Sequence, residues 1–198
     1  MDLFSVTIIL FLIMDPIGNI SSFLKLLHEL TPVQRNKIIL REMTIALIAM
    51  IAFNFIGEAI FNILKISEIT LRLTSGIILF LVGIKILFPT IDSPRANLTI
   101  EGEEPFVTPL AIPLIAGPSL LGTIMLFAHL EPNFFILPAA ILIAWTFSLL
   151  VLLSGTFLNR ILTDNGLKAA ERLMGMIMIL IAIQMTFEGL HHFVQSCR

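Results

Sequence analysis

Asp15 is the residue of this sequence best placed for chemistry, because it interrupts a long apolar segment. Residues 3–14 before it are mostly hydrophobic, and the apolar pattern resumes at Ile20. A carboxylate inside a membrane span costs about 2.5–3.5 kcal/mol on insertion scales, so such a residue is expected to face the protein interior and to have a function. The sequence leaves two roles open. Asp15 caps a helix that begins at Pro16, or its charge also binds an ammonium group or exchanges a coupling proton.

Two further residues follow Asp15 within about one helical turn. Gly18 permits close approach of the backbone, and the amide of Asn19 suits hydrogen bonding to a small polar solute. An amide inside a membrane also serves as a contact between helices, which is the structural alternative for Asn19. The segment from Asp15 to Asn19 therefore combines a charge, a backbone break and an uncharged hydrogen-bonding group.

A second interruption, Gly117-Pro118-Ser119, lies in the second half of the chain. A proline lacks a backbone donor and disfavours helical geometry in the residue before it, so each interrupted segment is expected to form two half-helices. Gly117 is expected to cap the second one. The N-terminal ends of half-helices present free amides and partial positive charge, which fit a carboxylate. A carboxylate there and an ammonium group near Asp15 together describe an amino acid. The candidate substrate-binding residues are therefore Asp15, Pro16, Gly18, Asn19, Gly117, Pro118 and Ser119.

The composition predicts an all-α, polytopic membrane protein. The chain is 57% hydrophobic and 13% charged, and its mean hydropathy is +1.00, outside the range of soluble domains. A membrane span needs roughly 20 apolar residues. Asp164-Asn165-Gly166 is expected to form a turn before the last span. Six spans are predicted, at about 3–28, 38–64, 69–88, 105–129, 134–158 and 169–194.

The two interrupted spans, one and four, are expected to be broken near mid-membrane. Irregular backbone survives in lipid only where protein or a wet cavity covers it. Paired interruptions in the two halves of a membrane protein indicate a substrate site near the bilayer midplane. The breaks therefore predict a site enclosed by the remaining helices.

The two halves align as a repeat, with Pro16 opposite Pro118 and Arg72 opposite Arg172. Each half has three predicted spans, an odd number, so the second half enters the membrane from the opposite side. Such a 3+3 inverted repeat is typical of secondary transporters. The expected organisation is a first three-span repeat at 1–88, a cytoplasmic linker at 89–104 and a second three-span repeat at 105–198.

The positive charges predict the orientation. Lysines and arginines gather in the connections that follow spans one, three and five, and the positive-inside rule assigns those connections to the cytoplasm. Both termini are then periplasmic.

Arg72 and Arg172 lie early in spans three and six, toward opposite membrane faces. Glu58, late in span two, is expected at nearly the depth of Arg72, which makes an ion pair between them a natural expectation. Two roles stay open for these residues. They snorkel or form a structural ion pair, or each arginine closes one face of the protein in turn.

The sequence shows no residue set for catalysis, metal binding or cofactor binding. Cys197 is the only cysteine, and there is no phosphate-binding glycine loop or basic patch for nucleic acid. We therefore expect no enzyme activity, catalytic residue, metal or cofactor, and no nucleic-acid partner. The expected partners are the lipid bilayer and a small-molecule substrate, and a homo-oligomer is left open.

Three motifs closely resemble the MarC family of bacterial inner-membrane proteins, and in particular its YhgN-like branch. They are the segment from Asp15 to Asn19, the run from Glu103 through Pro109 and Pro113 to Ser119, and the segment from Glu171 to Gly175. The resemblance covers essentially the whole chain. It implies six spans, a bacterial plasma membrane and kinship with the LysE-type exporter superfamily. Some relatives are regarded as transporters of small neutral amino acids.

The leading interpretation of the sequence is a secondary transporter of a small polar solute, a neutral amino acid or a similar metabolite. Protons are the favoured coupling ion, because the predicted core offers one lone carboxylate and no carboxylate cluster. The alternative is a membrane scaffold or regulatory protein that transports nothing and whose broken helices serve packing alone.

Overall fold

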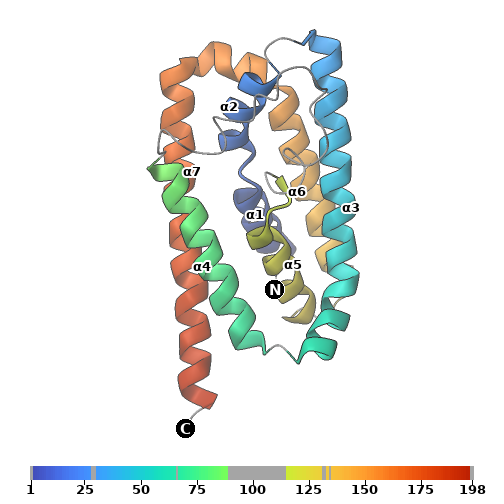
Figure 1. Cartoon of the computed structure of the whole chain (residues 1–198), viewed down its shortest axis with the longest axis vertical. Coiled ribbons are helices and arrows are strands. Elements are labelled where there is room, and N and C mark those ends of the chain that lie inside the picture. The colour runs from blue at the N-terminus through green and yellow to red at the C-terminus, as the bar shows by residue number, and fades with distance from the viewer. Residues whose placement is uncertain are drawn as a thin grey trace.

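The computed structural model describes residues 2–27, 30–65, 67–88, 115–130, 133 and 135–196. Within these ranges all regular structure is helical, which confirms the all-α prediction. The predicted linker 89–104 and the beginning of the predicted fourth span lie outside the described residues. In chain order the described helices are α1 (Leu3–Met14), α2 (Pro16–Leu26), α3 (Pro32–Leu64), α4 (Glu68–Leu87), α5 (Pro118–Leu130), α6 (Ile136–Leu153) and α7 (Gly155–Ser196) (Figure 1).

Five helical segments of the described chain are long and apolar enough to cross a membrane. They are Leu3–Ser21, Pro32–Gly57, Glu68–Leu87, Ile136–Leu153 and Asn165–Gln195. The first of these runs through α1 into α2. α5 is apolar but has 13 residues, and it matches the second part of the predicted fourth span. The count of six spans and the 3+3 repeat therefore stay predictions.

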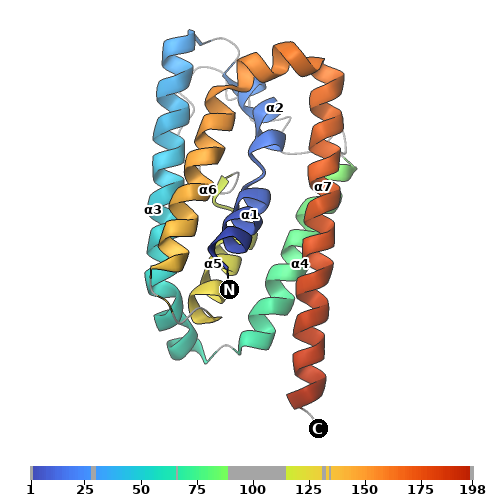
Figure 2. The same ribbon diagram turned by 180° about the vertical axis from the view of Figure 1, so that it is seen from behind.

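The helices form an elongated bundle with α1 and α2 in its interior. α3 lies along one side of the bundle, while α4 and α7 lie along the other (Figures 1 and 2). α1 packs mainly against α6, α2 mainly against α7, and α3 against both α5 and α6. We call the end at which α2 leads into α3 the α2–α3 end, and the opposite end the α3–α4 end.

The interior is apolar, and so is much of the outer surface. Large side chains such as Leu10, Met50 and Ile141 are almost completely buried. Others remain exposed on several helices, among them Phe55, Phe80, Leu142, Phe147, Leu180 and Phe187. Exposed apolar area on this scale marks a surface that another apolar phase covers. Together with the five long apolar segments, it describes a protein whose outer faces contact lipid.

α4 and α7 pack more extensively than any other pair of described helices, and glycines allow their backbones to approach closely. A Cβ atom added to Gly76 would lie 2.5 Å from the Oγ1 of Thr186, and one added to Gly83 would lie 2.7 Å from the Cγ1 of Ile179. Small residues at a helix contact are the usual basis of association in lipid, where no hydrophobic force drives helices together. These glycines therefore hold the α4–α7 pair together.

The connection between α6 and α7 differs from the one predicted. The turn expected at 164–166 is absent, because α7 is one continuous helix of 42 residues. The chain instead turns at Ser154, whose backbone N–H closes the end of α6 on the carbonyl of Leu150 at 3.0 Å. α7 then crosses the α2–α3 end and bends down along α4 (Figure 2). Turn-forming residues are tolerated there because the chain changes direction without leaving helical geometry.

Candidate functional site

Asp15 ends α1 and begins α2. Its backbone is left-handed, with φ 45° and ψ 57°, a region that Asp enters more readily than most residues. Its N–H donates to the carbonyl of Leu12 at 3.1 Å, and its Oδ1 accepts a hydrogen bond from the N–H of Gly18 at 3.0 Å. Only 3% of the residue is exposed. The predicted cap at Asp15, with Pro16 as the first residue of α2, is therefore confirmed.

Gly18 is required by the position of this carboxylate. A Cβ atom at Gly18 would overlap the side chain of Asp15, so any larger residue would push the carboxylate away from the first turn of α2. The sequence suggested close approach at Gly18, and the structure shows that the group approaching it is the side chain of Asp15.

Asn19 ties the two helices of the break together. Its Nδ2 donates to the carbonyl of Met14, the last residue of α1, at 3.0 Å, and its backbone N–H donates to the carbonyl of Asp15 at 3.0 Å. Asn19 is 1% exposed. A carbonyl at the end of a helix has lost its intrahelical partner, and the amide of Asn19 replaces it. The break is thus fixed by side chains from its own sequence.

The second group of candidate residues lies at the beginning of α5, which starts at Pro118 as predicted. The N–H of Leu121 donates to the carbonyl of Gly117 at 3.0 Å. Ser119 is buried, whereas Pro118 is exposed, and the hydroxyl of Thr123 donates to the carbonyl of Ser119 at 2.8 Å. α5 packs against α1 as well as α3 and α4. α5 therefore contacts α1, the helix that ends at Asp15.

Arg72 joins α4 to α7. Its Nη1 lies 2.8 Å from the Oε2 of Glu188, and its Nε lies 2.8 Å from the Oε1 of Glu68. The side chain of Arg72 is 11% exposed and that of Glu188 44%. The side chain of Glu58, the partner predicted from the sequence, lies outside the described residues, so that pairing stays a prediction.

Arg172, which aligns with Arg72 in the repeat, lies exposed on α7. Its neighbour Glu171 accepts a hydrogen bond from the hydroxyl of Ser21 at 3.1 Å. This bond joins α2 to α7 one residue away from the arginine. The repeat-related position thus carries a contact between helices, but the contact uses Glu171.

Glu42 is a buried acidic residue that the sequence analysis missed. Its side chain on α3 is 0% exposed. The Nε and Nη2 of Arg41 both donate to its Oε1, at 3.1 and 2.9 Å. Its Oε2 is buried without a hydrogen-bond partner in the structure. A helical count would have found it, because Ile39 and Ala46, one turn before and after it, are also buried.

α6 connects the surroundings of Asp15 and Glu42. The hydroxyl of Ser148 donates to the Sδ of Met14 at 3.6 Å, and the Nε1 of Trp145 donates to the carbonyl of Met43 at 2.7 Å. Trp145 and Ser148 are three residues apart on one helix, which is about 4.5 Å along its axis. Met14 precedes Asp15, and Met43 follows Glu42. The two buried carboxylates therefore lie at similar depth on two sides of α6.

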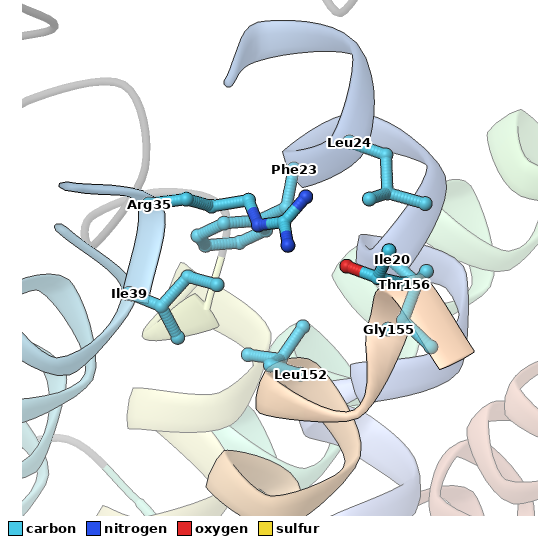
Figure 3. Close-up of a pocket in the computed structure, with 8 residues that line it drawn as sticks. All are labelled: Ile20, Phe23, Leu24, Arg35, Ile39, Leu152, Gly155 and Thr156. Atoms are coloured by element: carbon cyan, nitrogen blue, oxygen red, sulfur yellow. The ribbon is translucent and has the colours of Figure 1, made fainter. Parts of the chain in front are cut away.

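A narrow pocket opens between these carboxylates and the α2–α3 end. The side chain of Arg35 extends from α3 toward Phe23 of α2, and the hydroxyl of Thr156 adds a second polar group (Figure 3). Ile39 is one turn from Glu42 in α3, and Ile20 is just over one turn from Asp15. The lining residues are Ile20, Phe23, Leu24, Arg35, Ile39, Leu152, Gly155 and Thr156.

Among the described residues, no group of three or more His, Cys, Asp or Glu side chains could hold a metal ion. The polar groups of the site are instead a carboxylate, amides and hydroxyls at helix ends. Such groups can bind a small polar or zwitterionic molecule through hydrogen bonds and charge.

The chain matches known proteins over nearly its whole length. It is 46% identical over 191 residues to a UPF0056 membrane protein of Buchnera aphidicola subsp. Baizongia pistaciae, covering 96% of each chain. It is 41% identical over 196 residues to the UPF0056 inner membrane protein YhgN of Escherichia coli, covering 98% of this chain and 99% of that one. No solved structure matches it.

The model of the family described as MarC family integral membrane protein matches residues 1–194. This match and the relatives above agree with the motifs around Asp15, Ser119 and Glu171. The chain belongs to the MarC family of integral membrane proteins.

Proposed function

We propose that this protein is a secondary transporter of the bacterial inner membrane, and that it moves a small polar solute, a neutral amino acid or a similar metabolite. The relative from Escherichia coli is named an inner membrane protein, which supports the same location here. We further propose that the protein is not an enzyme.

The observation that carries this proposal is the buried carboxylate of Asp15 at an interrupted helix. The residue is 3% exposed, and it lies at the N-terminal end of α2, where amide dipoles favour negative charge. A solute with an ammonium group would meet the charge of Asp15. Its carboxylate would meet the amides at the beginning of α5. A zwitterion satisfies both requirements.

The contact between α4 and α7 supports the proposed inverted repeat. Gly76 of α4 approaches Ala182 and Thr186, while Gly83 approaches Gly175 and Ile179. The helices therefore run antiparallel, and each contributes small residues seven apart, Gly76 with Gly83 and Gly175 with Ala182. The spacing of small residues is thus the same on both helices. A two-fold axis in the membrane plane, which relates the halves of an inverted repeat, would produce such a symmetric contact. α4 and α7 would be the third helices of the two repeats.

The orientation that we propose puts the α2–α3 end in the cytoplasm and both termini in the periplasm. Arg35 and Lys37 begin α3 at this end, and Arg160 lies in the part of α7 that follows the pocket residues Gly155 and Thr156. Arginine and lysine concentrate on the cytoplasmic side of bacterial membrane proteins. Arg72 and Glu188 then lie toward the periplasm, where their ion pair would close that face during part of the cycle.

The deciding experiment is uptake of labelled amino acids into proteoliposomes that contain the purified protein. A panel of small neutral, acidic and basic amino acids separates substrate classes, and empty liposomes measure leakage. We expect saturable uptake of at least one small neutral amino acid, with unlabelled solute of the same kind competing. Leakage-level uptake for the whole panel, from protein that is folded and monodisperse, would instead favour the scaffold.

A further inference from the structure

The carboxyl group of Glu42 is held by one oxygen only. An arginine usually engages a carboxylate through both oxygens in a bidentate pair. Here the two donors of Arg41 converge on Oε1, and Oε2 is buried without a hydrogen-bond partner. The side chain of Glu42 has no exposed area, whereas that of Arg41 is 43% exposed. The pair is therefore asymmetric both in bonding and in burial.

The helices that pack against α3 bring no second cation toward Glu42 in the described part of the chain. α6 contains no titratable residue, and α5 contains only His129, which is exposed near its far end. On α3 itself, Arg35 and Lys37 lie one to two turns toward the α2–α3 end. Lys25 of α2 follows the pocket residue Leu24 toward the same end.

The second carboxylate at this depth, Asp15, lies on the other side of α6. Two negative charges at the same depth of a low-dielectric bundle disfavour each other. Asp15 accepts the N–H of Gly18 at the positive end of α2, and a helix N-terminus stabilises a negative charge. Glu42 lies inside α3 and has no such helix end. The two carboxylates are therefore held differently, Asp15 by the beginning of a helix and Glu42 by the side chain of Arg41.

A proton on Oε2 would remove the charge of Glu42 without leaving Arg41 as an unpaired cation in the interior. A buried carboxylate with an unbonded oxygen carries a large desolvation penalty, which neutralisation relieves. A cation left behind in the interior would cancel this gain. Arg41, however, is 43% exposed, so part of its side chain lies at the protein surface and is not buried with Glu42. Neutralising Glu42 would therefore not leave Arg41 as a buried, unpaired cation.

We propose that Glu42 takes up and releases the coupling proton, while Asp15 stays ionised and binds the ammonium group of the solute. The inference rests on the transport function proposed above and names the ion-binding residue for it. Uptake forms one O–H bond at Oε2 with a proton delivered by water, and release returns that proton to water. The pocket residue Ile39 lies one turn from Glu42 in α3, and we propose that the proton enters from this side, the α2–α3 end.

The first test follows the proton itself and does not depend on transport. Infrared difference spectra of the purified protein between acidic and alkaline pH detect the carbonyl stretch of a protonated carboxyl group. Glu42→Gln should lose one such band, shifted as expected for a buried carboxyl. Asp2→Asn, which changes an exposed carboxylate without a capping bond, should keep it. A Glu42→Gln spectrum identical to that of the unsubstituted protein would overturn the proposal.

The second test separates coupling from transport in proteoliposomes. Exchange of labelled for unlabelled solute needs no net proton movement, whereas accumulation against a gradient does. Glu42→Gln should keep exchange and lose accumulation driven by a pH gradient, while Asp2→Asn keeps both. Accumulation by Glu42→Gln at the level of the unsubstituted protein would refute a coupling role. If the unsubstituted protein neither exchanges nor accumulates any solute, the transport proposal fails, and the infrared result still decides whether Glu42 binds a proton.

Discussion

The Nδ2 of Asn19 donates a hydrogen bond to the carbonyl oxygen of Met14 at 3.0 Å. This bond closes the end of α1 with a side chain from α2, although the backbone between the two helices is not helical. Both residues are almost completely buried, so water cannot replace the bond if it is lost. Side chains of the break itself therefore fix its geometry.

Asn19→Ala should loosen the break. It removes the buried donor and leaves the Met14 carbonyl unsatisfied, which typically costs about 1–3 kcal/mol. We expect a lower midpoint of thermal unfolding in detergent. Thr146→Ala is a matched control, because it also removes a side chain-to-carbonyl bond, but an exposed one. Equal midpoints for the two variants would contradict the role assigned to Asn19.

Asp15→Asn separates capping from charge. Asn caps a helix about as well as Asp, so this variant should express and fold normally yet lose transport if the charge binds an ammonium group. Asp15→Ala should in addition lower stability, by about 0.5–2 kcal/mol for the lost cap. Flux and unfolding midpoint are measured on the same preparations. Normal flux from the Asn variant would reduce Asp15 to a structural role.

Gly18→Ala should displace the Asp15 carboxylate, since the added methyl group would overlap it. We expect lower stability and loss of transport together. Gly155→Ala is the control, because its Cβ would meet the Cγ2 of Ile20 at 3.3 Å, a gap that a small shift of a flexible side chain relieves. A Gly18→Ala variant with normal stability and flux would show that the carboxylate has room to move.

The ion pair between Arg72 and Glu188 can be measured with a double-mutant cycle. Neutralising both residues should cost less than the sum of the single changes, with a coupling energy of about 0.5–3 kcal/mol for residues in contact. The same cycle with Glu58 tests the partner predicted from the sequence. Unfolding midpoints and flux are both recorded. Additive effects for Arg72 and Glu188 would show that their contact contributes nothing.

Reporter fusions test the orientation. A reporter fused after residue 198 should behave as periplasmic, and one inserted within 92–102 should behave as cytoplasmic, because the lysines and arginines follow the odd-numbered spans. Alkaline phosphatase and green fluorescent protein report the two sides with opposite signals. The reverse pattern would overturn the charge argument and the assignment of the α2–α3 end to the cytoplasm.

The sequence predicted the local features of the site correctly where a residue and its near neighbours determine them. The start of α2 at Pro16, the cap at Asp15 and the start of α5 at Pro118 are all confirmed. Each follows from chemistry within one helical turn: a fixed φ angle, a missing donor or a side chain that accepts an amide. Local rules also misled at 164–166, where turn-forming residues lie within a continuous helix.

Features that depend on packing between distant segments were not predictable in this way. Glu42 follows Arg41 near the start of a predicted span, and nothing in its near neighbours singles it out. Its burial depends on which face of α3 meets α5 and α6. The bond from Trp145 to the Met43 carbonyl joins residues about a hundred positions apart, and no local pattern in the sequence predicts it.

The way in which contacts divide between α1 and α2 has a mechanical consequence. α1 packs mainly against α6, which is bonded to α3 through Trp145, whereas α2 packs mainly against α7, which is joined to α4 at the glycines. The two parts of the interior segment, α1 and α2, therefore pack mainly against different pairs of helices. If those pairs rock against each other, the bending falls on the left-handed residue between them, and the bond from Asn19 to the Met14 carbonyl is the one that the motion strains. Asp15 would then be the hinge of the motion as well as the charge at its centre.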